Sequence, residues 1–64
     1  MLVKQIQFSS TLVIEIDLRR ETEYCYYVIN TDTNQVIADD SNIPSLDEAE
    51  DMSIDRVKEM LGIS

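Results

Sequence analysis

The sequence predicts an α+β fold, in which a small antiparallel sheet of three to four strands in meander order carries one C-terminal α-helix on one face. Two observations predict it. Apolar and polar residues alternate with a period of two from Leu2 to Leu18, and a second run that is apolar on both sides begins at Tyr24; both patterns are typical of strands. A capped amphipathic segment with helical periodicity then begins at Ser45. A chain of 64 residues forms one domain, so residues 1–64 are expected to be a single ββββα unit.

Apolar residues recur at even-numbered positions over residues 2–18, and two geometries would place them all on one face. One is a hairpin in which Ser9, Ser10 and Thr11 form the loop, so that Phe8 pairs with Leu12. The other is one long strand bent near the serines, which is rarer at that length. In either geometry residues 12–18 have one apolar face, which forms the first part of the core. It consists of Leu12, Ile14, Ile16 and Leu18.

Two further strands are predicted after a polar turn over residues 19–23. The third covers Tyr24–Asn30. Asp32 and Thr33 suit a type I turn that Asn34 closes in the left-handed conformation. A short fourth strand is then expected over residues 35–38, and residues 39–42 are expected to form a loop.

The helix is predicted over residues 46–61. Ser45 suits the N-cap, and Glu48 three residues on completes a capping box. Gly62 suits the position after the helix, with Ile63 placed to fold back on the last turn. At 100° per residue one side of the helix is apolar, with Ser53 among its members. The apolar residues of that side are Leu46, Ala49, Ile54, Val57, Met60 and Leu61.

The third strand is apolar on both sides, whereas one helix covers only one face of a sheet. The uncovered face should carry Val13 and either the even-numbered or the odd-numbered residues of that strand. Tyrosine is enriched at protein interfaces, so this face predicts a homodimer, a higher homo-oligomer or a foreign partner. The candidate residues for the oligomer or partner face are Val13, Tyr24, Cys25, Tyr26, Tyr27 and Ile29.

The charge balance limits the kinds of partner. Thirteen acidic against five basic residues give a net charge of −8, which argues against direct binding to nucleic acid or an anionic membrane. It favours a basic protein partner, including one that itself binds nucleic acid. Carboxylates gather on one side of the predicted helix, where successive members at i and i+4 lie about 6 Å apart along the axis. This candidate partner-binding face consists of Asp47, Glu48, Asp51, Asp55 and Glu59.

Catalytic residues, cofactors and metal sites are not expected. The chain has no histidine, so Cys25 lacks the usual base for a nucleophilic cysteine. A single cysteine inside a strand suits a reducing cytoplasm, and no apolar stretch approaches the ~20 residues of a membrane span.

These features predict a small acidic protein-binding module without enzymatic activity. It resembles in kind the inhibitors and adaptors that bacteriophages and mobile elements encode against host proteins. Rows of carboxylates spaced like successive phosphates occur in small proteins that occupy the nucleic-acid grooves of enzymes. Two alternatives are an oligomerising structural or regulatory subunit, and a sponge-like protein that holds a small molecule between protomers.

Overall fold

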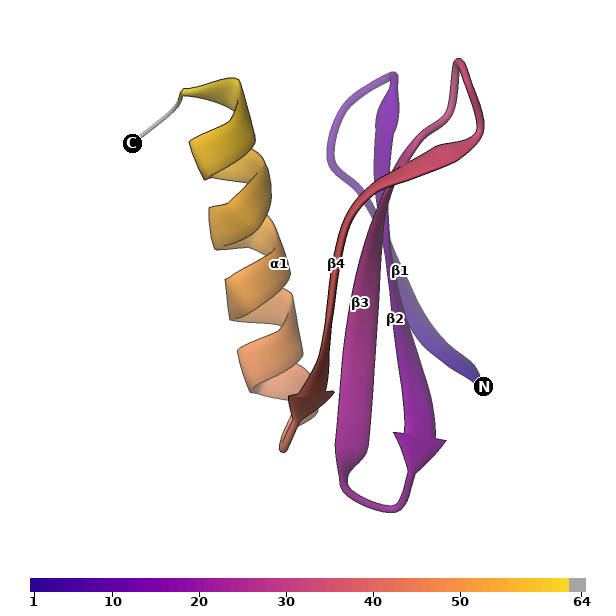
Figure 1. The fold of residues 1–64 in the computed structure, drawn as a ribbon, viewed down its shortest axis with the longest axis vertical. Coiled ribbons are helices and arrows are strands. Elements are labelled where there is room, and N and C mark those ends of the chain that lie inside the picture. The colour runs from indigo at the N-terminus through magenta and orange to yellow at the C-terminus, as the bar shows by residue number, and fades with distance from the viewer. Residues whose placement is uncertain (63–64) are drawn as a thin grey trace.

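The computed structural model describes residues 1–62 and has the predicted α+β architecture. The four strands form one antiparallel sheet in the order β1-β2-β3-β4, and one helix packs against it (Figure 1). The strands are β1 (Leu2–Gln7), β2 (Leu12–Arg20), β3 (Glu23–Asn30) and β4 (Gln35–Ile43). The helix α1 (Leu46–Leu61) is the last element.

The first two strands form the hairpin, so the alternative of one long strand over residues 2–18 is wrong. The Phe8 N–H donates to the Leu12 carbonyl at 3.0 Å, and Ile6 lies opposite Ile14. Ser9, Ser10 and Thr11 therefore form the loop as predicted. The Thr11 N–H donates to the Ser9 hydroxyl at 3.3 Å, which stabilises a tight loop that contains no glycine.

The fourth strand is longer than predicted, and the loop expected over residues 39–42 is wrong. Asp39 lies opposite Tyr27, and Ile43 lies opposite Tyr24. The extension needs a local irregularity, which Asn42 supplies with a positive φ of 60°. Its polar residues are compatible with a strand because β4 is at the edge of the sheet. Asn34 closes the preceding turn with a φ of 57°, as predicted.

The helix spans the predicted residues and is capped at both ends. The Ser45 hydroxyl accepts from the Glu48 N–H at 3.1 Å, which is the first of the two hydrogen bonds of a capping box. Gly62 ends the helix in the left-handed conformation, with a φ of 74°, and its N–H donates to the Glu59 carbonyl. The predicted return of Ile63 onto the last turn lies outside the described residues.

The core lies between the sheet and α1. Ile14 and Ile16 of β2, with Tyr26 and Val28 of β3, are buried beneath the helix. The helix contributes its small residues to this contact, since the side chains buried along it are Ala49, Ser53 and Val57. The Ser53 hydroxyl donates to the Glu50 carbonyl at 2.9 Å, so a polar group is buried without an unmet hydrogen bond.

The buried side of the helix is shorter than the apolar side that its sequence predicts. Met60 and Leu61 belong to the predicted apolar side of the helix, but they are 41% and 49% exposed. The buried line of α1 ends at Val57, and both residues lie on the turn beyond it. Leu46 and Ile54, also on the predicted apolar side, are half-buried and pack against the core.

Candidate functional site

The five carboxylates predicted to form a partner-binding face lie on the side of α1 that faces away from the sheet. We call this set the acidic row; it consists of Asp47, Glu48, Asp51, Asp55 and Glu59. All five are exposed, and four of them follow one another at intervals of about one helical turn, since 47, 51, 55 and 59 differ by four residues. The buried line through Ala49 and Val57 holds the opposite side of the helix against the sheet. The row is therefore presented on a fixed element rather than on a loop.

Neither ion pair of residues 1–62 neutralises a carboxylate of the acidic row. Within residues 1–62 the ion pairs are Lys4 with Glu50 at 2.6 Å and Arg19 with Glu23 at 3.9 Å. Neither pair includes a member of the row. Like charges at i and i+4 each cost a helix a few tenths of a kcal/mol, so the row slightly destabilises the isolated chain.

The sheet face opposite the helix carries the odd-numbered residues of β3. Cys25, Tyr27 and Ile29 point to this side, which we call the open face. Tyr24 and Tyr26 point to the helix instead: Tyr26 is 2% exposed in the core, and Tyr24 packs against it. Tyr24 and Tyr26 are therefore not part of the open face, contrary to their place in the predicted partner face.

The open face divides into an apolar row and an acidic region across three strands. Val13 of β2, Ile29 of β3 and Val36 of β4 lie side by side in register. In the neighbouring row Tyr27 lies between two carboxylates, since Glu15 of β2 and Asp39 of β4 are its cross-strand partners. A single aromatic side chain is thus flanked by negative charge on both neighbouring strands.

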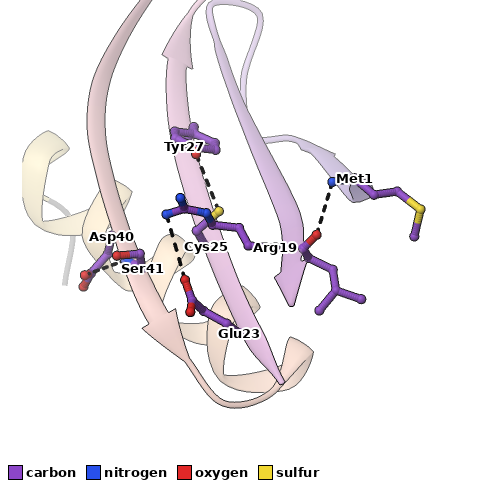
Figure 2. A network of polar contacts seen from close by, with 8 residues as sticks. Met1, Arg19, Glu23, Cys25, Tyr27, Asp40 and Ser41 are labelled. Carbon is purple, nitrogen blue, oxygen red and sulfur yellow. Dashed lines mark hydrogen bonds and ion pairs between the residues drawn. The ribbon is translucent and has the colours of Figure 1, made fainter. Parts of the chain in front are cut away.

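A hollow of about 190 Å³ opens on this face between β2 and β4. Its lining combines a guanidinium, a thiol, a phenol, a hydroxyl and two aspartates: Arg19, Cys25, Tyr27, Asp39, Asp40 and Ser41. Figure 2 shows Arg19 extending toward Glu23 and lying in front of Cys25. Cys25 is 1% exposed although α1 packs on the opposite face of the sheet, and it lies among the lining side chains of the hollow.

Polar contacts fix the floor of the hollow. The Cys25 thiol donates to the Tyr27 hydroxyl at 3.6 Å, and both side chains belong to β3 (Figure 2). On β4 the Asp40 carboxylate accepts from the Ser41 N–H at 2.8 Å. Asp39 and Asp40 take part in neither ion pair of residues 1–62. Arg19 has Glu23 as its partner, so its charge is partly offset within the same face.

The pKa values of Tyr26 and Tyr27 are raised mainly by burial and by the contact with Cys25, and nearby carboxylates add to both shifts. The pKa of Tyr27 is raised first by its hydrogen bond and charge interaction with Cys25, then by burial and by the Asp17 carboxylate, while Arg19 lowers it. Burial is the largest cause of the raised pKa of Tyr26, followed by the charge of Asp40. Both phenols are therefore neutral across the physiological pH range.

The described part of the chain has no grouping of three or more histidine, cysteine, aspartate or glutamate side chains that could hold a metal ion. Over residues 1–62 no helix has both the length and the apolar character needed to cross a membrane. Comparison with protein-family models, with curated proteins and with solved structures finds no match.

Sequence reasoning found the acidic row but missed the hollow. The polar run over residues 39–42 predicts a loop, and a loop does not connect Asp39 or Asp40 with Tyr27. The signal that connects them is the strand register, in which Asp39 lies opposite Tyr27. Arg19 and Ser41 line the hollow from β2 and β4, although the sequence predicts a turn over residues 19–23 and a loop over residues 39–42.

Proposed function

We propose that this protein is a small acidic binding protein without enzymatic activity, which inhibits or recruits a basic protein by docking its acidic row on it. The observation that carries the proposal is a row of carboxylates on the outer side of α1 that takes part in neither ion pair of residues 1–62. The most suitable partner is a protein with a groove for nucleic acid, because such a groove presents lysine and arginine along a line of phosphates.

The spacing of the row supports this choice of partner. Asp47, Asp51 and Asp55 follow one another at about 6 Å along the helix axis, similar to the separation of successive phosphates along a nucleic-acid strand. The like-charge cost of the row would be recovered when cations of a partner neutralise it. A net charge of −8 on 64 residues would also steer the protein toward a basic surface.

The absence of enzymatic activity is part of the proposal, and the shape of the molecule supports it. The hollow of about 190 Å³ is smaller than the 300 to 1,000 Å³, roughly, of small-molecule sites. A buried cysteine hydrogen-bonded to a neutral phenol has no base to activate it. The free thiol suits a reducing cytoplasm, where we expect the protein to act.

The experiment compares two variants of equal net charge. Asp51→Asn with Asp55→Asn removes the centre of the acidic row. Glu21→Gln with Asp32→Asn removes the same number of exposed charges from turns outside the row. Affinity capture from a lysate with each protein as bait should recover a basic partner with the unmodified protein and with the turn variant, and lose it with the row variant.

Salt dependence completes this test. Binding through several charge pairs weakens steeply as salt rises, whereas binding through an apolar face does not. A partner that the row variant retains as well as the unmodified protein does, at every salt concentration, would contradict the proposal. A partner lost equally by both variants would show that net charge alone, and not the row, governs capture.

Self-association through the open face is the second candidate function, because the apolar row of that face ends in an exposed residue. Val36 is 51% exposed, and it continues the row that starts at Val13 and Ile29. Joining two copies through this face would bury the row and enclose Tyr27. Such a seam is also where a sponge-like protein would hold a small molecule. The repulsion between two chains of −8 each works against this arrangement.

A further inference from the structure

The hollow on the open face has the size of a single side chain. Its volume of about 190 Å³ is close to that of an internal cavity that accepts one benzene-sized molecule, roughly 150 Å³. Tyr27 and Cys25 of β3 form its floor, and Asp39 and Ser41 of β4 form one wall. A metabolite with several polar groups would extend beyond it, whereas one long side chain from another protein would fill it.

The charges around the hollow favour a cation. Asp39 on the wall and Glu15 on the far side of Tyr27 both flank the phenol in the strand register. Asp17 lies opposite Cys25 in the same face. The one basic residue of the lining, Arg19, is already paired with Glu23. An entering anion would meet these carboxylates, whereas an entering cation would meet the carboxylate of Asp39 and the aromatic side chain of Tyr27.

We propose that the hollow receives one arginine or lysine side chain of a basic protein partner, with Asp39 as the counter-charge and the Tyr27 ring as the stacking surface. Arginine suits the site better, because a planar guanidinium stacks on aromatic rings and forms paired hydrogen bonds with a carboxylate. The apolar row through Ile29 and Val36 would cover the residues next to the inserted side chain.

This site is distinct from the acidic row and lies in the opposite layer of the molecule. The row faces outward from α1, whereas the hollow opens on the sheet face that the helix leaves uncovered. The protein could therefore bind two basic surfaces at the same time, as an adaptor does. The inference does not require the acidic row to bind, so the two proposals can fail separately.

The test uses the full chain labelled with ¹⁵N and a short glycine peptide that carries one arginine. The same peptide with citrulline in place of arginine keeps the shape and removes the charge. The arginine peptide should produce saturable shifts in the amide signals of Tyr27, Asp39 and Ser41, with α1 unaffected. The citrulline peptide should produce none of these shifts at the same concentrations.

Matched variants then separate the site from general attraction. Asp39→Asn should lower the affinity for the arginine peptide about fivefold, which is the effect of losing one charge pair of ~1 kcal/mol. Asp32→Asn removes an equal charge from the β3–β4 turn and should change the affinity less than about twofold by comparison. Tyr27→Leu keeps an apolar side chain and should weaken binding through loss of the ring.

Several results would overturn the proposal. One is a set of shifts that grow linearly and spread over α1 and the sheet alike, which marks non-specific attraction. Others are equal binding of the citrulline peptide, or equal losses in Asp39→Asn and Asp32→Asn. Shifts at Tyr27 and Ile29 that appear on concentrating the protein without peptide would identify a second copy, and not a foreign cation, as the occupant.

Discussion

Two neighbouring tyrosines of β3 offer a test of which sheet face lies beneath the helix. Tyr26 is 2% exposed and lies in the core under α1, whereas Tyr27 is half-buried on the open face. Replacing each in turn with alanine makes the same chemical change at adjacent positions of one strand. Differences in the unfolded state and in strand propensity are therefore small between the two variants.

The expected losses differ severalfold. Removing a buried aromatic side chain from a core costs about 3–5 kcal/mol, because the transfer free energy and a cavity both count. Tyr27 lies on the sheet face opposite α1 and is half-buried, so Tyr27→Ala should cost about 1 kcal/mol. A chain of this length has a net stability of roughly 3–10 kcal/mol. Tyr26→Ala should thus lose from about a third to all of this stability, whereas Tyr27→Ala stays folded.

Urea denaturation followed by circular dichroism measures both losses from the midpoint and the slope. The melting temperature of Tyr27→Ala should fall by about 4–8 °C, the shift expected for ~1 kcal/mol in a domain of this size. Equal losses for the two variants, or a larger loss for Tyr27→Ala, would refute the assignment of the even-numbered set to the core.

Three further predictions concern the helix cap, alkaline pH and self-association. Ser45→Ala should lower the unfolding free energy by about 1 kcal/mol, because it removes the acceptor for the Glu48 N–H, and an unchanged denaturation midpoint would contradict that cap. Burial raises the pKa of Tyr26 in the folded protein, so the stability it contributes is complete below pH 10.0 and is lost as the pH rises through the folded value. Tyr26→Phe should therefore reduce the alkaline loss of stability relative to the unmodified protein, and identical alkaline denaturation curves would contradict this origin. Sedimentation equilibrium should give a dimer that Tyr27→Asp converts to monomers if the open face self-associates, and a monomer mass for the unmodified protein would exclude that candidate.

Much of the fold could be predicted because each local pattern agrees with the tertiary structure. Ser45 and Gly62 mark the two ends of α1, and the structure places the caps there. The positions of the apolar residues on either side of Ser9–Thr11 predict the register in which Ile6 lies opposite Ile14, and the structure has this register. Caps and period-two alternation are local signals, so the sequence contains them in full.

The assignment of faces on β3 could not be predicted, because both sides of that strand are apolar. The face that the even-numbered residues of β3 occupy can be inferred from β2 only if the length of the turn between the two strands is known. The turn after β2 was expected over residues 19–23, but both strands extend into it, and an irregularity lies between Leu18 and Arg20. The pairing of Ile16 with Tyr26 then decides which tyrosines face the helix.

The extent of β4 and the hollow were missed for a related reason. Asp39 to Asn42 is polar and reads as a loop, but an edge strand tolerates polar residues because one of its sides faces solvent. Its backbone pairing with β3 brings Asp39 next to Tyr27. A long-range pairing of this kind depends on the whole sheet, and no local pattern contains it.

The most direct test of the central claim is the affinity of a captured basic partner for three proteins measured side by side by calorimetry at low and at physiological salt. These are the unmodified chain, the acidic-row variant with Asp51→Asn and Asp55→Asn, and the turn variant with Glu21→Gln and Asp32→Asn. The account predicts that the row variant binds at least about tenfold more weakly than the turn variant, with a shallower salt dependence. Equal affinity of the two variants at both salt concentrations would contradict it.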